Sequence, residues 1–469
     1  MINRRSFINQ SAGVALGFLG LHKLIGTGYG DQGYENQVTG YGELLEDAFR
    51  ILDLPEGFSY QVLSREGAEM ADGLLVPGKP DGMAAFRAAD DNVVLVRNHE
   101  LSPDQVFHGA FGLRNQLRGK IDQSKFYDPG KGVLPHLGGT TNVVYNPKTG
   151  KVVRQFLSLA GTERNCAGGP TPWGTWVTCE EPGDLTPGTF GTVGHGYNFE
   201  VPAYTQPELA APIPLKAMGR FRHEAIAVDP KSGVVYETED QGDGLIYRFI
   251  PREKGNLQAG GKLQALAVRG KKAFDTRNWE ENGGKTVNQG DSLEVEWIDL
   301  EGIDSEENDL RQRGAEAGAA VFARGEGMWY GQGAVYFACT NGGEIGRGQI
   351  WKYTPSPFEA SDHESNYPGK LELFIESTKA ELLEFADNLT VAPWGDLIIA
   401  EDGPENQYLR GVAPDGRLYT LGRNRYNTSE FAGVCFAPHV PVLFVNIQTP
   451  GITLAITGPW QKFAKESVS

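Results

Sequence analysis

The chain has 469 residues, of which 40% are hydrophobic and 62 are glycine, as is typical of a large all-β domain. Its 43 basic and 60 acidic residues give a formal charge of −17. This charge argues against binding to nucleic acid or to an anionic membrane surface, and it favours the binding of cations.

Residues 1–40 predict an export segment. Arg4 and Arg5 precede a mild apolar run at 13–21, as in a bacterial twin-arginine signal. We therefore expect delivery by the twin-arginine export machinery to the periplasm or the exterior; a disordered basic tail is the alternative. The run is too short for a stable transmembrane helix, so the mature protein is expected to have no membrane span. The folded domain is expected at 41–459, followed by a tail at 460–469.

The stretch 222–244 predicts a β-hairpin. Two apolar runs with high strand propensity flank Asp229-Pro230-Lys231-Ser232-Gly233, whose proline and glycine favour a turn. Antiparallel pairing would place Glu224 beside Glu239. Two adjacent carboxylates repel one another unless they are solvated or neutralised by a cation.

The same plan recurs along the chain, with a polar residue opening the first strand of each hairpin and another closing the second. Repetition of this kind predicts a six-bladed β-propeller as a single domain. In a propeller the first strand of each blade lines the central channel, so the opening and closing residues should meet near one mouth. These residues are Asp81, Glu100, Cys166, Glu181, Glu224, Glu239, Glu326, Asn341, Asp387, Asp402, Glu430 and Asn446.

So many carboxylates cannot share a small cavity in ionised form unless cations neutralise them. Oxygen ligands suit Ca²⁺, and a thiolate among them indicates a transition metal such as iron. Cys166 occupies an opening position and is favoured for that role, although Cys179 competes with it. Cys339 and Cys435 lie within apolar runs and are expected in the core. The alternative interpretation is that the acids only rim a wet channel and cap turns.

Two segments interrupt the predicted repeat. Residues 101–137 have a loop-like composition, and 251–322 form a charged insertion whose end, 305–322, predicts a helix capped by Ser305 or Asp304. His99 and His223 each precede an acid, so on a strand they should point to the opposite side as packed residues.

Several motifs carry a resemblance to a known family. LPEGFSYQVLS at 54–64, RNHE at 97–100, GTERNCAGGPTPWGTWVTCEE at 161–181, ARGEGMWY at 323–330 and DNLTVAPWGDLIIAEDG at 387–403 together resemble the PhoX-type alkaline phosphatases over about residues 50–455. The resemblance implies a twin-arginine-exported β-propeller that hydrolyses phosphomonoesters. It also implies a channel that holds Fe³⁺ and Ca²⁺ ions bridged by an oxo group. The chain is shorter than familiar members, which leaves the substrate range open.

Carried over by position, the resemblance implies that Cys166, Glu224 and Glu326 bind iron. The acids it implies for calcium are Asp81, Glu100, Asp387 and Glu239, and Glu181 and Asp402 complete the expected metal ligands. Arg324, two residues before Glu326, is expected to bind phosphate oxygens, and these two residues form the expected catalytic pair. A structural ion pair with a channel acid is the alternative for Arg324.

Other catalytic signals are absent: the sequence contains no Gly-x-Ser-x-Gly and no His-Glu-x-x-His motif. A calcium-dependent propeller lactonase or phytase-like hydrolase is the second enzymatic hypothesis. A non-enzymatic, calcium-stabilised binding propeller is the third.

Overall fold

A computed structural model describes residues 33–132, 134–189 and 191–460. Most of the predicted export segment, including Arg4 and Arg5, and nearly all of the predicted tail lie outside the described residues. The compact unit begins at Glu35, earlier than the expected position 41. Within it, the backbone amide of Gln37 already donates to the Leu418 carbonyl. Among the described residues, no helix is long and apolar enough to cross a membrane.

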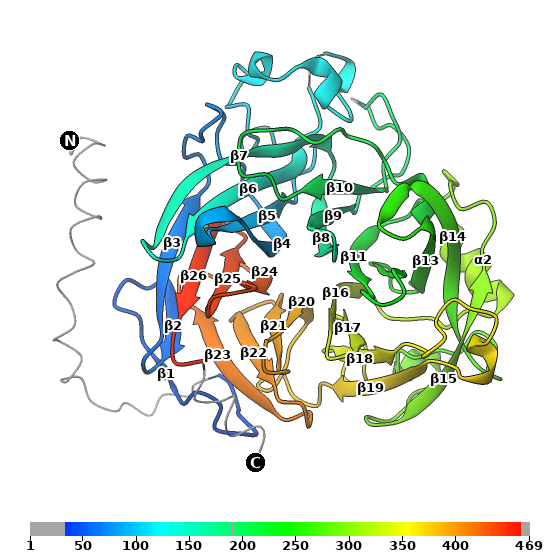
Figure 1. Ribbon diagram of the computed structural model, residues 1–469. Coiled ribbons are helices and arrows are strands. Elements are labelled where there is room, and N and C mark those ends of the chain that lie inside the picture. The colour runs from blue at the N-terminus through cyan, green and yellow to red at the C-terminus, as the bar shows by residue number, and fades with distance from the viewer. Residues whose placement is uncertain (1–32, 133, 190, 461–469) are drawn as a thin grey trace. The chain divides into compact units, whose positions relative to one another are not determined.

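The unit is built from antiparallel sheets in a propeller-like arrangement, which confirms the all-β prediction (Figure 1). One sheet contains β4 (Pro80–Arg87), β5 (Val93–His99), β6 (Gly138–Asn146) and β7 (Lys151–Thr162). A second contains β8 (Asn165–Pro170), β9 (Thr175–Glu180) and β10 (Asn198–Pro202).

The largest sheet has nine strands. Its first half contains β11 (His223–Val228), β12 (Val235–Glu239), β13 (Ile246–Glu253) and β14 (Asn256–Val268). Its second half contains β16 (Gly325–Gly331), β17 (Ala334–Cys339), β18 (Gln349–Thr354) and β19 (Lys370–Glu376). The outermost strand β15 (Ser292–Asp299) pairs with both β14 and β19 and so joins the halves.

Segments near the N-terminus complete the last two sheets. One comprises β20 (Ala386–Val391), β21 (Leu397–Glu401), β22 (Tyr408–Val412) and β23 (Leu418–Asn424), extended by β2 (Leu52–Pro55) and β1 (Leu44–Leu45). The other comprises β24 (Phe431–Phe436), β25 (Val442–Ile447) and β26 (Ile452–Thr457), with β3 (Ser59–Arg65) at its edge. β3 is one of the first strands of the chain, and β24–β26 are the last three. The pairing of β3 with β26 therefore links the two ends of the fold.

The first strands of these units, β4, β8, β11, β16, β20 and β24, lie around the centre in Figure 1. Each contacts the next, and β24 contacts β4. Glycines permit this close approach: a Cβ on Gly327 would lie 2.6 Å from the Asp387 carbonyl oxygen, and one on Gly433 would lie 2.2 Å from that of Asp81. The strands behind them, such as β5 and β17, are buried along their whole length, which explains the apolar runs at 93–96 and 334–339.

The insertion expected at 251–322 is in large part sheet, so that interpretation was wrong. It contains β14 and β15, whose charged, half-exposed positions conceal the strand pattern. The expected helix at 305–322 is shortened to α2 (Leu310–Ala317). Asn308 adopts a left-handed φ of 49°, which prevents an earlier start, and the helix ends at Gly318. Residues 101–137 contain the one-turn 3-10 helices η2 (Arg118–Lys120), η3 (Gln123–Lys125) and η4 (Gly130–Gly132).

Candidate metal centre

Every central strand carries a β-bulge at the same place. In each of these strands two consecutive residues stand outside the regular pairing. The first of the two is Asp81 in β4, Cys166 in β8, Glu224 in β11, Glu326 in β16, Asp387 in β20 and Gly433 in β24. A bulge redirects a side chain out of the sheet pattern. Five of the predicted opening residues therefore occupy one equivalent position, whereas Glu430 lies just before its strand and Gly433 stands at the bulge.

A repeated backbone hydrogen bond identifies the closing position. In each unit the amide of the closing residue donates to the carbonyl of a residue that precedes the bulge, at 2.9–3.3 Å. The closing residues found in this way are Glu100, Glu181, Asp240, Thr340, Asp402 and Gln448, bonded to Lys79, Arg164, Arg222, Arg324, Phe385 and Glu430.

Three predicted closing residues are therefore displaced. Asp240, Thr340 and Gln448 occupy the positions expected for Glu239, Asn341 and Asn446. Glu239 pairs with His223 and not with Glu224, because the bulge adds one residue to β11. The Glu239 carboxylate is fully buried within its own sheet, where it accepts hydrogen bonds from the Tyr247 hydroxyl (2.6 Å) and the Leu245 amide (3.3 Å). Glu239, which was expected to bind a metal with the other acids, belongs to no group of possible metal ligands among the described residues.

Two neighbouring acids stand at the end of the second strand in three of the hairpins. In Glu180-Glu181, Glu239-Asp240 and Glu401-Asp402 the first acid is buried in the sheet and the second closes the hairpin. Glu180 contacts His195 at 2.7 Å, and Glu401 accepts from Arg410 at 2.8 Å. The adjacent acids were visible in the sequence and could have identified Asp240.

The remaining acids and one thiol form what we call the acidic cluster. It consists of Asp81, Glu100, Cys166, Glu181, Glu224, Asp240, Glu326, Asp387, Asp402 and Glu430. Its core is a chain of three groups, each with ligand atoms within 4.8 Å of one another: Cys166, Glu181 and Glu224; Glu224, Glu326 and Asp387; Asp387, Asp402 and Glu430. Because Glu224 and Asp387 are shared, the three groups are continuous.

Burial and mutual repulsion raise the pKa of six carboxyls of the cluster, those of Asp81, Glu224, Glu326, Asp387, Asp402 and Glu430. Burial is the largest cause at Asp81, with Glu100 and Asp387 adding to it. Burial and the neighbouring Asp402 raise the pKa of Asp387 to about 7. The pKa of Glu224 and of Glu326 is raised in the same way, by burial and by nearby acids. Such a set cannot be fully ionised without compensating positive charge.

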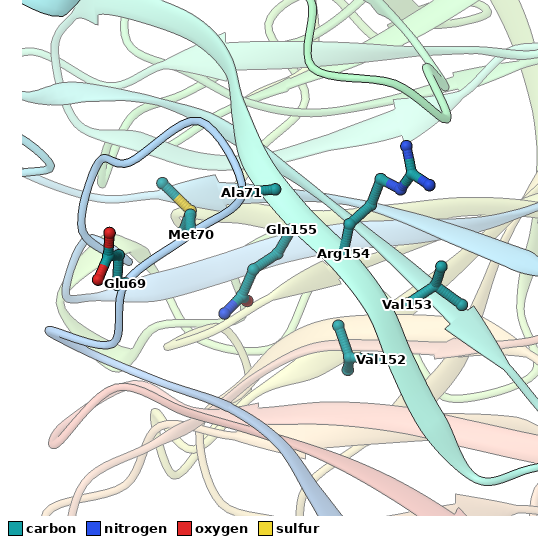
Figure 2. A pocket seen from close by; sticks show the side chains of 7 residues that line it. All are labelled: Glu69, Met70, Ala71, Val152, Val153, Arg154 and Gln155. Carbon is teal, nitrogen blue, oxygen red and sulfur yellow. The ribbon is translucent and has the colours of Figure 1, made fainter.

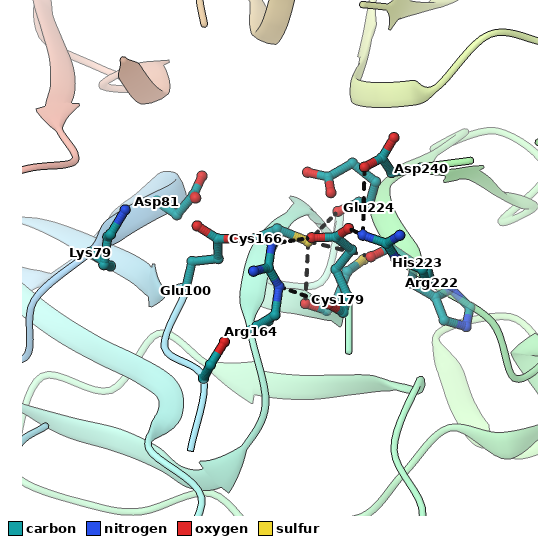
Figure 3. Close-up of polar contacts among 12 residues, drawn as sticks. Lys79, Asp81, Glu100, Arg164, Cys166, Cys179, Arg222, His223, Glu224 and Asp240 are labelled. Atoms are coloured by element: carbon teal, nitrogen blue, oxygen red, sulfur yellow. Dashed lines mark hydrogen bonds and ion pairs between the residues drawn. The ribbon is translucent and has the colours of Figure 1, made fainter. Parts of the chain in front are cut away.

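Cationic side chains compensate only part of this charge. Arg324 donates through Nε to Asp240 Oδ1 (2.7 Å), and through Nη2 to Asp240 Oδ2 (3.0 Å) and Glu326 Oε1 (2.7 Å). Arg222 contacts Glu181, and Arg164 donates to Glu100 and to Glu181 Oε2 (2.8 Å). Arg164 and Arg324 both have left-handed φ values, 46° and 45°, a strained conformation that often occurs at functional sites. Figure 3 shows Arg164 between Glu100 and Cys166, with Glu224 beyond.

The two cysteines near the cluster differ. The Cys166 sulfur belongs to the group with Glu181 and Glu224, whereas among the described residues Cys179 belongs to no such group. Burial and the charge of Glu224 raise the pKa of the Cys166 thiol. Without a cation this thiol stays protonated, so a metal ion would be needed to hold the thiolate.

The residues present fit metal ions. Buried carboxylate oxygens converge from several strands and retain more negative than positive charge. Carboxylate oxygens suit hard cations such as Ca²⁺, and the single sulfur favours a transition metal beside Glu181 and Glu224.

Other expectations concern residues outside the cluster. His99 is buried and contacts the Gly78 carbonyl and Thr141, and His223 stacks on Phe221, so both are packed residues as predicted. Cys339 and Cys435 lie in the core, also as predicted.

A shallow pocket of about 400 Å³ lies elsewhere (Figure 2). It is lined by Glu69, Met70, Ala71 and residues 152–155 of β7. None of these residues belongs to a group of possible metal ligands. The acidic cluster is therefore the stronger candidate for chemistry.

A family model described as alkaline phosphatase PhoX matches residues 39–451. The chain belongs to the PhoX alkaline phosphatase family. It is a metal-dependent phosphatase. No curated protein matches the sequence.

One solved structure supports the fold. PhoX from Pseudomonas fluorescens, solved in complex with vanadate, a transition state analogue, is 18% identical with a TM-score of 0.65 and covers 87% of this chain and 96% of its own. A gluconolactonase from Xanthomonas campestris is 12% identical with a TM-score of 0.39, covering 87% and 97%. Virginiamycin B lyase from Staphylococcus aureus is 11% identical with a TM-score of 0.36, covering 85% and 99%.

Proposed function

We propose that this protein hydrolyses small phosphate monoesters, releasing inorganic phosphate and an alcohol, at metal ions held by the acidic cluster. The observation that carries the proposal is the continuous series of ligand groups from Cys166 to Glu430, flanked by arginines. Family membership supports the reaction class.

Iron and calcium are the proposed ions. Cys166 and Glu224, which share one group, would hold Fe³⁺ together with Glu326 from the adjacent group. Asp387, Asp402 and Glu430 offer only oxygen ligands and suit Ca²⁺. Asp81 and Glu100, bridged by the Gln448 amide at 3.1 and 2.9 Å, form a second all-oxygen region. When bound, these ions would neutralise developing negative charge and lower the pKa of a nearby water molecule.

Arg324 is proposed to bind the phosphate. Its guanidinium is held by Asp240 and Glu326, and its side chain remains 40% exposed. Asp240 engages Nε and Nη2, and Nη1 donates no hydrogen bond to any of the described residues. Nη1 is therefore free to donate to a phosphoryl oxygen, while the two carboxylates fix the plane of the guanidinium. Both interpretations from the sequence, an ion pair and a phosphate ligand, can apply to this residue.

We also propose a six-bladed architecture. The contacts from β4 through β8, β11, β16, β20 and β24 back to β4 support this number, with the nine-stranded sheet counted as two blades joined by β15.

Export by the twin-arginine machinery to a periplasmic or extracellular location is proposed from Arg4, Arg5 and the apolar run at 13–21.

The test is turnover of an aryl phosphate monoester by the purified protein, measured beside an aryl lactone. We expect phosphate release that is lost in Glu224→Gln, because Glu224 is shared by two ligand groups. The matched control is Glu253→Gln, which changes an exposed acid at the end of β13. Hydrolysis of the lactone without phosphate release would contradict the proposal, as would full phosphatase activity in Glu224→Gln.

A further inference from the structure

A second group of possible metal ligands lies outside the acidic cluster. Asp128, His136 and His195 present ligand atoms within 4.8 Å of one another, and all three residues are buried. Asp128 and His136 come from the loop between β5 and β6, and His195 from the segment between β9 and β10. The group therefore joins two loops that are distant in sequence.

Both imidazoles have a carboxylate beside Nδ1. His195 Nδ1 lies 2.7 Å from Glu180 Oε1, and His136 Nδ1 lies 3.1 Å from Glu163 Oε2, although the second contact lacks good hydrogen-bond alignment. In metal sites a ligating histidine commonly donates its other ring N–H to a carboxylate, which fixes the tautomer and the ring orientation. Here that arrangement leaves Nε2 of each ring as the ligand atom.

Both Nε2 atoms face the same oxygen. Asp128 Oδ2 lies 3.5 Å from His195 Nε2 and 3.7 Å from His136 Nε2, and the two rings stack with centroids 4.4 Å apart. These distances exceed those of ordinary hydrogen bonds. They approach the separation of about 3.4 Å between neighbouring ligands of a tetrahedral ion with bonds of about 2.1 Å.

The atom aimed into the site has no other partner. His195 is 0% exposed, and its Nε2 has no hydrogen-bond partner among the described residues. Asp128 is held in place by the amides of Gly130 (2.7 Å) and Thr192 (2.7 Å) and by the Thr192 hydroxyl (2.8 Å). Burial opposes ionisation of Asp128, but the neighbouring His195 imidazole and these amides lower its pKa overall. The carboxylate is thus preorganised as an anionic ligand.

We propose that Asp128, His136 and His195 bind a divalent transition-metal ion of the zinc class, with solvent at the fourth position. Two imidazoles and one carboxylate suit Zn²⁺, in contrast to the oxygen-rich acidic cluster. The ion would hold Asp128 and His136 against His195, which lies between β9 and β10. Glu180, which supports His195, is adjacent to Glu181 of the acidic cluster, so the ion stabilises a neighbouring ligand without entering the reaction. The inference does not rest on the proposed function.

The competing occupant is a proton. Burial disfavours a charged imidazole at His195, but Glu180 and Asp128 outweigh burial and raise its pKa to about 10. A protonated His195 would also satisfy Asp128. Metal binding has to displace this proton, and the two occupants are distinguishable by spectroscopy.

The experiment uses the full chain, stripped by a chelator and titrated with Co²⁺. We expect the intense visible bands of four-coordinate Co²⁺, lost on addition of about one equivalent of Zn²⁺. His136→Gln and His195→Gln should abolish the bands. The bands should survive Cys166→Ser, which alters the acidic cluster, and His108→Gln, which changes an exposed histidine. Absence of the bands in the wild type, or their persistence in both histidine variants, would overturn the proposal.

X-ray absorption at the zinc edge is measured on the reconstituted wild type alone. It therefore tests the site even if the histidine variants do not fold. The expected ligands are nitrogen and oxygen at about 2.0–2.2 Å. Sulfur in the zinc ligand shell would assign the ion to Cys166 and refute the proposed site.

Discussion

Replacing Asp387 with asparagine should change how the stability of the metal-free protein depends on pH. Burial and Asp402 raise the pKa of Asp387 from 3.8 to about 7 in the folded chain. Between these values the folded state binds more protons than the unfolded state, so the free energy of unfolding falls as pH rises from about 4 to about 7 and is constant above. The displacement corresponds to about 4 kcal/mol.

The assay is urea denaturation in excess chelator at intervals between pH 4 and pH 8, for the wild type and Asp387→Asn. The variant should be more stable than the wild type at pH 8. Its free energy of unfolding should also fall less between pH 4 and pH 7, because it lacks the contribution of the Asp387 carboxyl. Asp415→Asn, at an exposed acid paired with Arg417, is the control and should leave the decrease unchanged. The prediction is wrong if the free energy of unfolding of the metal-free wild type rises or stays constant across this range. It is also wrong if Asp387→Asn shows the same dependence on pH as the wild type.

Three further substitutions address individual roles. Arg324→Ala should retain the metals and lower kcat/KM by on the order of tenfold to a thousandfold, with partial recovery in Arg324→Lys; full efficiency would leave Arg324 as an ion-pair residue only. Cys166→Ser should lose iron with the fold preserved, because a hydroxyl is a poorer ligand than a thiolate; elemental analysis that shows iron loss only in Cys179→Ser would reverse the assignment. Asp240→Asn should raise KM for the phosphate ester, because it releases one side of the Arg324 guanidinium; steady-state kinetics that match the wild type would count against this positioning role.

Much of the central geometry could be predicted because it depends on local pattern. Cys166, Glu224, Glu326 and Asp387 each open a predicted hairpin in the same way, and the structure places them at equivalent bulges. The closing residues were less predictable, because the hairpins differ in length while the bulge stays in the same place: Gly168 pairs with Thr178, whereas Ile226 pairs with Glu237, one residue further along the chain. That is why Asp240 occupies the position expected of Glu239.

Other features depend on contacts that no local pattern reports. The outer strand β15 and the first half of β14 are largely exposed or half-exposed, so their charged residues were interpreted as an insertion. The group of Asp128, His136 and His195 joins two loops and has no metal-ligand spacing in the sequence. Only the folded chain brings its atoms together.

The most direct test of the account is metal content and phosphatase activity measured on the same samples as the stripped protein is reconstituted with Fe³⁺ and Ca²⁺. The account predicts that hydrolysis of an aryl phosphate monoester rises in proportion to the bound ions in the wild type and that Glu224→Gln neither retains iron nor recovers activity. Full phosphatase activity in samples free of bound metal would contradict it.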